Sequence, residues 1–275
     1  MKKLIMIMLI SLVGLSLNSF AQGDLLITPS RIVFDGKQQK KEINLVNTGK
    51  DTAIYSISFV EKKMKEDGSF ENTGNEESGL MFAEPYIRVF PRTVTLAPGE
   101  AQVIMLQCKR KKDMLAGEYR SHLYFRAEKD SKPLGMENTT IDSKLMSVQL
   151  TPIYGLTIPV IIRSGKVNGI STLSNLKLGT KKDNEQFLKL TINRTGNIST
   201  YGNITVEFIP ASGKPYQVAA VNGVGVYTNI NKRNMDIKLD ESSGKSLSGG
   251  KLKVQYINNV NNKPVLYAES ILDIK

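Results

Sequence analysis

The segment SVQLTPIYGLTIPVIIR, residues 147–163, decides the fold class of this chain. Its apolar side chains recur at every second position, which is the period of a β-strand with one apolar face. They are Val148, Leu150, Tyr154, Leu156, Ile158, Val160 and Ile162. Pro152 and Pro159 have no N–H to give to a neighbouring strand, so the pattern predicts an edge strand or an interrupted one. A long apolar edge favours pairing with another chain, and we therefore expect this edge to be used.

Period-two alternation also dominates the rest of the chain. Residues 53–59 place Ala53, Tyr55, Ile57 and Phe59 on one face, and residues 119–127 alternate in the same way. Turn signals such as Asp35-Gly36 and Ser212-Gly213 separate these runs. Charged and glycine-rich stretches at 61–79 and 129–144 are predicted to be loops. Many short strands with frequent turns predict an all-β protein built of sandwiches.

Residues 1–21 have the charged, apolar and small-residue regions of a Sec-type signal peptide. Cleavage after Ala21 would leave Gln22 at the mature terminus and about 250 residues, which suits two domains of ordinary size. The alternative, a membrane anchor, requires a longer apolar run. No later segment is apolar enough to span a bilayer. The net charge of +11 favours acidic partners, and export argues against nucleic acid as the partner.

The residues needed for common catalytic and metal sites are scarce. His122 is the only histidine and Cys108 the only cysteine, so the chain lacks the ligands of a His/Cys zinc site. His122 shares a strand face with Arg120 and Tyr124, so we expect it to point into solvent rather than to act as a base. Cys108 continues an alternating apolar run and is expected in the core. The sequence predicts no enzyme, catalytic residue, metal or cofactor; an enzyme with paired carboxylates is a remote alternative.

Several segments, taken in order, give the chain a resemblance to the periplasmic pilus-assembly chaperones. They are residues 28–34 with Arg31, 42–48, 86–99, 117–125 and 156–163 with Arg163. The match covers most of residues 24–165, and the best local similarity in the remainder is 193–197. The resemblance implies two immunoglobulin-like β-sandwich domains, residues 22–163 and 164–275, joined by a short hinge at 163–166 and set in an L shape. Residues 1–21 remain the signal peptide.

The same resemblance implies a function. Chaperones of this family bind pilin-like subunits that lack their final strand, and they insert their own last N-domain strand into the gap, a form of strand addition. Val148, Leu150, Tyr154 and Leu156 would then enter the client, and Ile158, Val160 and Ile162 would face the chaperone's own core. Implied partners are pilin-like or other secreted subunits that lack a strand, with an outer-membrane usher as a further candidate.

The resemblance also assigns an anion site. Arg31 matches the family arginine that holds the client's terminal carboxylate between the domains. The position of the family lysine, four residues before Arg163, is Pro159 here, so Arg31 is the cation that the match supplies. Alternatives remain: Arg31 as an exposed strand arginine, Arg163 as a linker residue in an interdomain salt bridge, and the apolar register as ordinary core. A structural or adhesive surface protein built of similar sandwiches is the alternative function.

Overall fold

The computed structural model describes residues 25–74, 79–128, 154–180, 185–240, 247, 249–260 and 263–274. Val148 and Leu150, the proposed cleavage site and the predicted loop at 129–144 lie outside these ranges. Strands dominate, and η1 (Glu84–Tyr86) is a single turn of 3₁₀-helix. None of the helices in the described ranges is long and apolar enough to cross a membrane.

The described residues between Leu25 and Ser164 form a sandwich of two sheets. One sheet has the order β1-β3-β9-β7, with β1 (Leu25–Thr28), β3 (Lys40–Asn47), β9 (Ala101–Cys108) and β7 (Ile87–Phe90). The other has the order β2-β11-β10-β4-β8, with β2 (Ile32–Phe34), β11 (Gly155–Ser164), β10 (Gly117–Glu128), β4 (Ala53–Val60) and β8 (Thr93–Leu96). The parallel pairing of β2 with β11 joins the start of the domain to its last strand. A four-stranded sheet packs on a five-stranded sheet in which the last two strands, β10 and β11, are neighbours. This is the arrangement of an immunoglobulin-like sandwich.

The described residues between Gly169 and Ile274 form a second sandwich. Its smaller sheet has the order β12-β13-β16, with β12 (Gly169–Thr180), β13 (Gln186–Gly196) and β16 (Lys232–Lys238). The larger sheet has the order β15-β14-β17-β18, with β15 (Tyr216–Val226), β14 (Thr200–Pro210), β17 (Gly250–Val260) and β18 (Lys263–Ile274). Each sandwich has its own core of alternating inward side chains, and Val160 in the first and Val254 in the second are fully buried. The predicted all-β class with two sandwich domains is confirmed.

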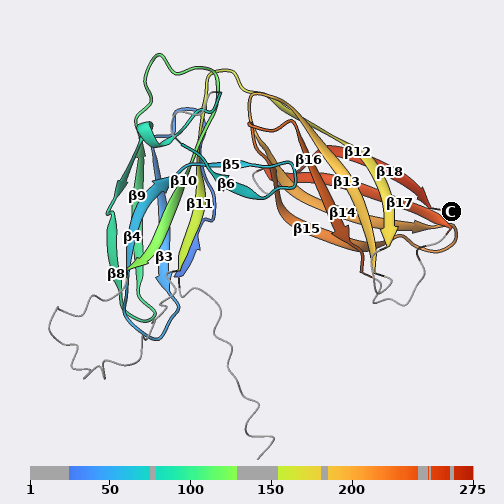
Figure 1. Ribbon diagram of the computed structural model, residues 1–275, viewed down its shortest axis with the longest axis horizontal. Helices are drawn as coiled ribbons and strands as arrows, with labels where there is room; N and C mark the ends of the chain where they lie inside the picture. Colours follow the sequence, from blue (N-terminus) through green and yellow to red (C-terminus); the bar gives the residue numbers. More distant parts are fainter. Residues whose placement is uncertain are drawn as a thin grey trace, which may run out of the picture.

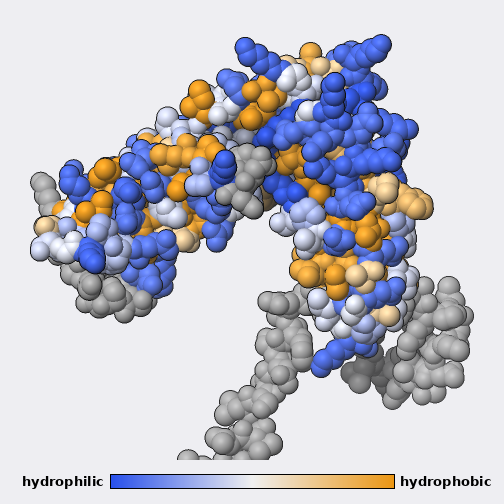
Figure 2. Space-filling view, turned by 180° about the vertical axis from the view of Figure 1, so that it is seen from behind, coloured by the Kyte–Doolittle hydropathy of each residue, from blue (hydrophilic) through white to orange (hydrophobic). Residues whose placement is uncertain are grey.

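The two sandwiches meet at an angle close to the connection between β11 and β12 (Figure 1). Seen from behind, the molecule has the same bent outline (Figure 2). Hydrophilic side chains gather on the first domain near the bend, and apolar ones lie further from it (Figure 2). Cys108 lies in the first core with 2% of its surface exposed, as its alternating neighbours predicted.

The prediction that residues 61–79 form a loop is wrong for most of this segment. Residues 62–72 form a hairpin of β5 (Lys62–Met64) and β6 (Phe70–Asn72), with Asp67-Gly68 at its tip. The hairpin leaves the first sandwich and reaches the second (Figure 1). An Asp-Gly pair between two short runs is a hairpin signal, but the charged residues around it concealed the pattern. This hairpin is called the strap below.

Candidate functional site

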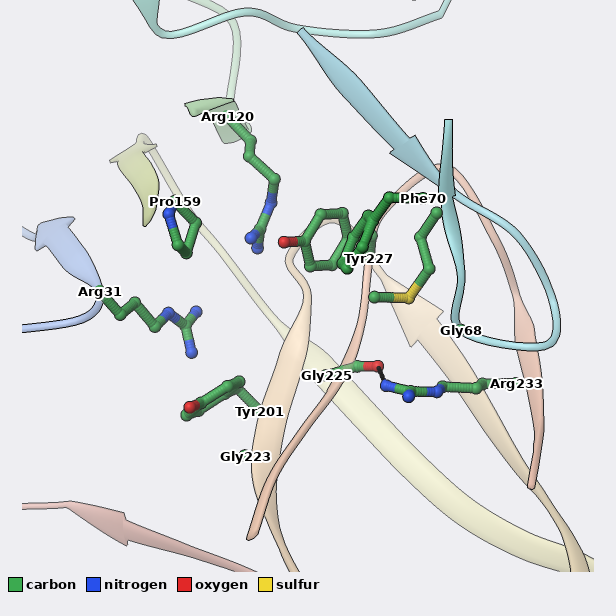
Figure 3. A pocket seen from close by; sticks show the side chains of 11 residues that line it. Arg31, Gly68, Phe70, Arg120, Pro159, Tyr201, Gly223, Gly225, Tyr227 and Arg233 are labelled. Atoms are coloured by element: carbon green, nitrogen blue, oxygen red, sulfur yellow. Dashed lines mark hydrogen bonds between the residues drawn. The ribbon is translucent and has the colours of Figure 1, made fainter. Parts of the chain in front are cut away.

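The structure brings three arginines together in a cleft of about 150 Å³ between the two domains. Arg31 and Arg120 come from the first domain and Arg233 from the second, and aromatic rings line the space among them (Figure 3). The other lining side chains are Met64, Phe70, Pro159, Tyr201 and Tyr227. Guanidinium groups enclosed by apolar walls make a site for an anion, because charge attraction is stronger where water is excluded.

Arg31 lies in the connection between β1 and β2, which carries its side chain into the cleft. Its guanidinium carbon lies 4.2 Å from the centroid of the Tyr201 ring. The Nε and Nη2 atoms are buried and have no hydrogen-bond partner. Burial, followed by repulsion from Arg120, lowers the pKa of Arg31 to about 10, so it stays charged at neutral pH. A buried cation with two unused donors is unusual because each unmet donor costs free energy, and a bound anion would satisfy both.

Arg120 reaches the same cleft from β10, but an acid already pairs with it. Its Nη2 donates to Glu118 Oε1 at 2.5 Å and to Ser199 Oγ at 2.7 Å. Its guanidinium carbon also lies 3.6 Å from the centroid of the Tyr227 ring. Arg120 therefore lies beside Arg31 and Pro159 as the cation of a buried ion pair, and its charge is balanced by Glu118. Arg120 was not among the predicted site residues because its strand face was expected to be exposed.

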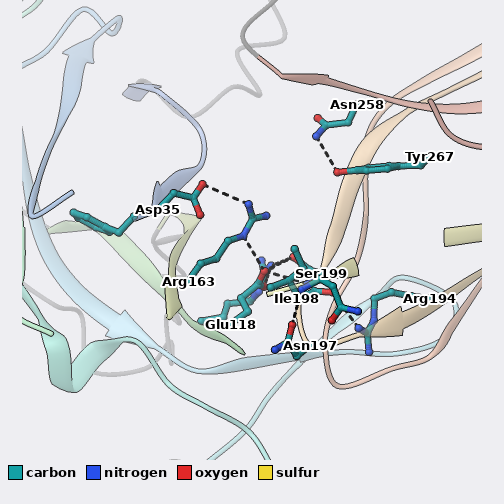
Figure 4. A network of polar contacts seen from close by, with 12 residues as sticks. Asp35, Glu118, Arg163, Arg194, Asn197, Ile198, Ser199, Asn258 and Tyr267 are labelled. Atoms are coloured by element: carbon teal, nitrogen blue, oxygen red, sulfur yellow. Dashed lines mark hydrogen bonds and ion pairs between the residues drawn. The ribbon is translucent and has the colours of Figure 1, made fainter. Parts of the chain in front are cut away.

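Glu118 connects the two domains (Figure 4). Its Oε2 accepts hydrogen bonds from the backbone N–H of Ser199 at 3.1 Å and from Ser199 Oγ at 2.8 Å. Burial alone would raise the pKa of Glu118, but the charge of Arg120 and the bonds from Ser199 outweigh it, so the pKa is lowered. Glu118 is thus a buried, ionised carboxylate that holds the second domain against β10. No sequence motif marked it.

Arg163 occupies the end of β11, directly before the second domain. Its Nη1 lies 3.4 Å from Asp35 Oδ2, and its Nε lies 3.8 Å from Glu118 Oε2 (Figure 4). Both acids belong to the first domain, so Arg163 reaches the second domain through the Glu118–Ser199 contact. On the far side, the buried Arg194 donates to the carbonyl oxygens of Gly196 and Ile198 and fixes the loop that presents Ser199.

The prediction that His122 points into solvent is wrong. His122 is 3% exposed, and its Nε2 lies 3.1 Å from the Tyr227 hydroxyl of the second domain. Phe70 of the strap covers the ring edge-on, with 6.1 Å between centroids. Burial, with smaller contributions from Arg120 and Lys62, lowers the pKa of His122 to about 3, so the ring is neutral near pH 7. Alternation correctly placed His122 on the outer face of β10, but the second domain and the strap cover that face.

The described part of the apolar segment runs from Tyr154 into β11. Ile158, Val160 and Ile162 are buried in the first core, as the register predicted. Tyr154 and Leu156 are 61% and 41% exposed. β11 pairs with β10 along its whole length, whereas β2 covers only Val160–Ile162. Within the described ranges, residues 155–159 therefore have a neighbouring strand on one side only. β11 is therefore an interior strand at residues 160–162, between β2 and β10, and an edge strand at residues 155–159.

Glu61 holds the base of the strap. Ser121 Oγ donates to Glu61 Oε1 at 2.6 Å, while the second carboxylate oxygen is buried without a partner. Burial is the main reason why the pKa of Glu61 is raised to about 7; Glu84 adds to it and the Ser121 bond opposes it. Because the folded state holds this proton more tightly than the unfolded chain does, stability is lost as pH rises from about 4.5 towards 7.

We therefore expect Glu61→Gln to leave the thermal midpoint nearly unchanged at about pH 5 and to raise it by several degrees at about pH 8. Glutamine keeps an acceptor for Ser121 and removes the buried charge. Glu71→Gln on the same hairpin is the control, because Glu71 is partly exposed and ion-paired with Lys63 and Lys65. Calorimetric melts at both pH values check this. An equal shift at the two pH values would contradict the assignment.

Comparison with known proteins identified similar solved structures only. No family model and no curated protein matches the chain. The YadV chaperone is 13% identical, with 92% of this chain and 100% of that chain covered and a TM-score of 0.43. The CsuC–CsuE chaperone–tip adhesion subunit complex of Acinetobacter baumannii is 12% identical, with 89% of this chain and 97% of that chain covered and a TM-score of 0.47. The Salmonella enterica SafA pilin in complex with the SafB chaperone is 12% identical, with 92% of this chain and 97% of that chain covered and a TM-score of 0.42. Identities of 12–13% do not indicate what this chain binds.

Proposed function

We propose that this chain is a non-enzymatic periplasmic chaperone of the pilus-assembly type, which binds secreted subunits that lack a strand. The observation that carries the proposal is the charged Arg31 in the interdomain cleft, buried with two unused donors. A chain terminus can enter such a cleft and place its carboxylate against the guanidinium, and a carboxylate can accept two parallel hydrogen bonds from an arginine. Among exported chains, a terminal carboxylate is the anion that every protein client carries.

Strand donation is the second part of the proposal. The exposed side of residues 155–159 has backbone groups available for an added strand, and Leu156 presents an apolar side chain there. In strand addition, main-chain bonds supply affinity and pockets for alternate side chains supply selectivity. We assign Tyr154 and Leu156, together with Val148 and Leu150 upstream, to the client's groove. The client is pilin-like, and delivery to an outer-membrane usher is the proposed next step.

The proposal is tested by purifying the tagged protein from the periplasm and identifying co-eluting proteins by mass spectrometry. A stoichiometric subunit that lacks one strand of its own sandwich is the expected result. A structural or adhesive protein of the same fold would instead be found at the cell surface without such a subunit. That outcome would replace the chaperone proposal.

Arg31→Ala is expected to weaken client binding by about one to two orders of magnitude, because a hydrogen bond to a charged group contributes about 1.5–3 kcal/mol. The fold should survive, since Arg31 lies in a connection and its Nε and Nη2 make no hydrogen bonds that the change would break. Titration with purified client measures the loss. Arg88→Ala, an exposed arginine on β7, is the matched control and should bind as the unaltered protein does. Equal affinity of both variants would refute the role of Arg31.

A further inference from the structure

The strap holds Arg233 in the cleft. Its tip packs on the second domain, where the Met64 carbonyl accepts from Asn229 Nδ2 at 2.8 Å and the Glu66 carbonyl accepts from the Asn234 N–H at 2.6 Å. Gly68 has a φ of +84° and lies flat against the Arg233 guanidinium, where a methyl group would overlap the Nε and Nη2 atoms. Arg233 Nη1 donates to the Gly225 carbonyl at 2.7 Å (Figure 3). The side chain is therefore fixed from both sides.

The acids near Arg233 are already engaged. Asp67 accepts from the backbone N–H of Ser69 at 2.8 Å and from its hydroxyl at 2.6 Å. Glu66 pairs with Lys232 at 3.3 Å. Arg233 has no ion pair within the described ranges, and its buried Nε has no hydrogen-bond partner. Asp67 acts on it only as a nearby charge. The cleft thus contains two cations without a paired acid, Arg31 on one wall and Arg233 on the other.

We propose that Arg233, positioned by the strap, is a second anion subsite that receives an acidic side chain at the client's C-terminal residue. The inference rests on the proposed function, in which Arg31 takes the terminal carboxylate. Two guanidinium groups without an ion-paired acid, on opposite walls of one cleft, match two negative charges on one ligand. The cleft, at about 150 Å³, is on the scale of a single residue. A terminal aspartate or glutamate carries both charges within that space.

The probes are three synthetic peptides with an acetylated N-terminus that are identical except at the C-terminal residue. They end in aspartate, in asparagine, or in aspartate with an amidated terminus, and binding is measured by calorimetry on the purified full chain. The unaltered protein should prefer aspartate over asparagine, and the free over the amidated terminus, by about tenfold each. Arg233→Gln should abolish the first preference and keep the second. Arg31→Ala should abolish the second and keep the first.

Three further variants separate positioning from folding. Gly68→Ala should reduce the aspartate preference because it displaces the guanidinium, whereas Gly79→Ala should not. Gly79 has a similar φ of +88° and open space around it, so the pair shares backbone strain and differs in the overlap. Arg233→Lys keeps the positive charge but loses the planar guanidinium with its two parallel donors. It should therefore retain part of the preference for aspartate over asparagine.

The outcomes distinguish the two proposals. An aspartate preference that survives both Arg233→Gln and Gly68→Ala would overturn the second subsite, and so would a protein that discriminates only the free terminus from the amide. A protein that shows neither preference would overturn the second subsite together with the carboxylate role of Arg31.

Discussion

Val160→Glu is expected to unfold the first domain, whereas Leu156→Glu, four residues earlier on the same strand, should leave it folded and abolish subunit capture. Val160 is fully buried between β2 and β10, so a glutamate there would be an unpaired carboxylate in the core. The cost, about 4 kcal/mol or more, is a large part of the 5–15 kcal/mol that stabilises a typical domain. Leu156 is 41% exposed, so its replacement removes little buried apolar surface. In the proposed complex, however, that position lies inside the client.

Thermal melts and client pull-downs on both variants measure the difference. Leu266→Glu, at an exposed leucine on β18 of the second domain, is the control for adding a carboxylate at an apolar surface position. It should neither melt early nor lose the client. If Leu156→Glu melts as early as Val160→Glu, the residues upstream of Ile158 belong to the core. The case for strand donation would then fail.

The fold class could be read from the sequence because a strand that faces a core must alternate. The register of residues 158–162 predicted that Ile158, Val160 and Ile162 fill the first core, since each sandwich fills its interior from alternate positions. It did not predict that Ile161, which is out of register, is buried as well. The sequence also placed Arg31 as a candidate anion ligand, and the structure places that side chain in the interdomain cleft. Its role there remains a prediction.

The rest of the site depends on how the two domains meet. The alternation of apolar and polar residues along one strand carries no information about contacts between domains. Arg120 and His122 were predicted to lie on a solvent-facing side of β10, yet both are buried, and so is Glu118 on the same face. The contacts that cover them come from Ser199, Tyr227 and the strap, which are distant in sequence. For the same reason Arg233 had no local signal: its position in the cleft depends on Gly68, 165 residues earlier in the chain.

Glu118→Gln is expected to have the largest effect on how the two domains are joined. The change leaves the buried Arg120 without its counter-charge, and it places an NH₂ group or a weaker acceptor against the donors of Ser199. Removing one partner of a buried ion pair typically costs about 3–5 kcal/mol. Because the domains have separate cores, we expect the single melting transition to divide into two, with each domain unfolding on its own.

Acid should act on the unaltered protein in the same direction as the Glu118→Gln change. The pKa of Glu118 is lower in the folded state, so the stability that it contributes is fully present above the ordinary pKa of 4.5 and is lost as pH falls through the folded value. The matched control for Glu118→Gln is Asp273→Asn. Asp273 forms an exposed ion pair with Lys251 at 3.1 Å, and exposed pairs contribute little to the free energy of unfolding. Differential scanning calorimetry at neutral pH compares the variants. One transition at an unchanged midpoint in Glu118→Gln would show that the domains are held together by other contacts, and the cleft that Arg31 and Arg233 share would then not depend on this carboxylate.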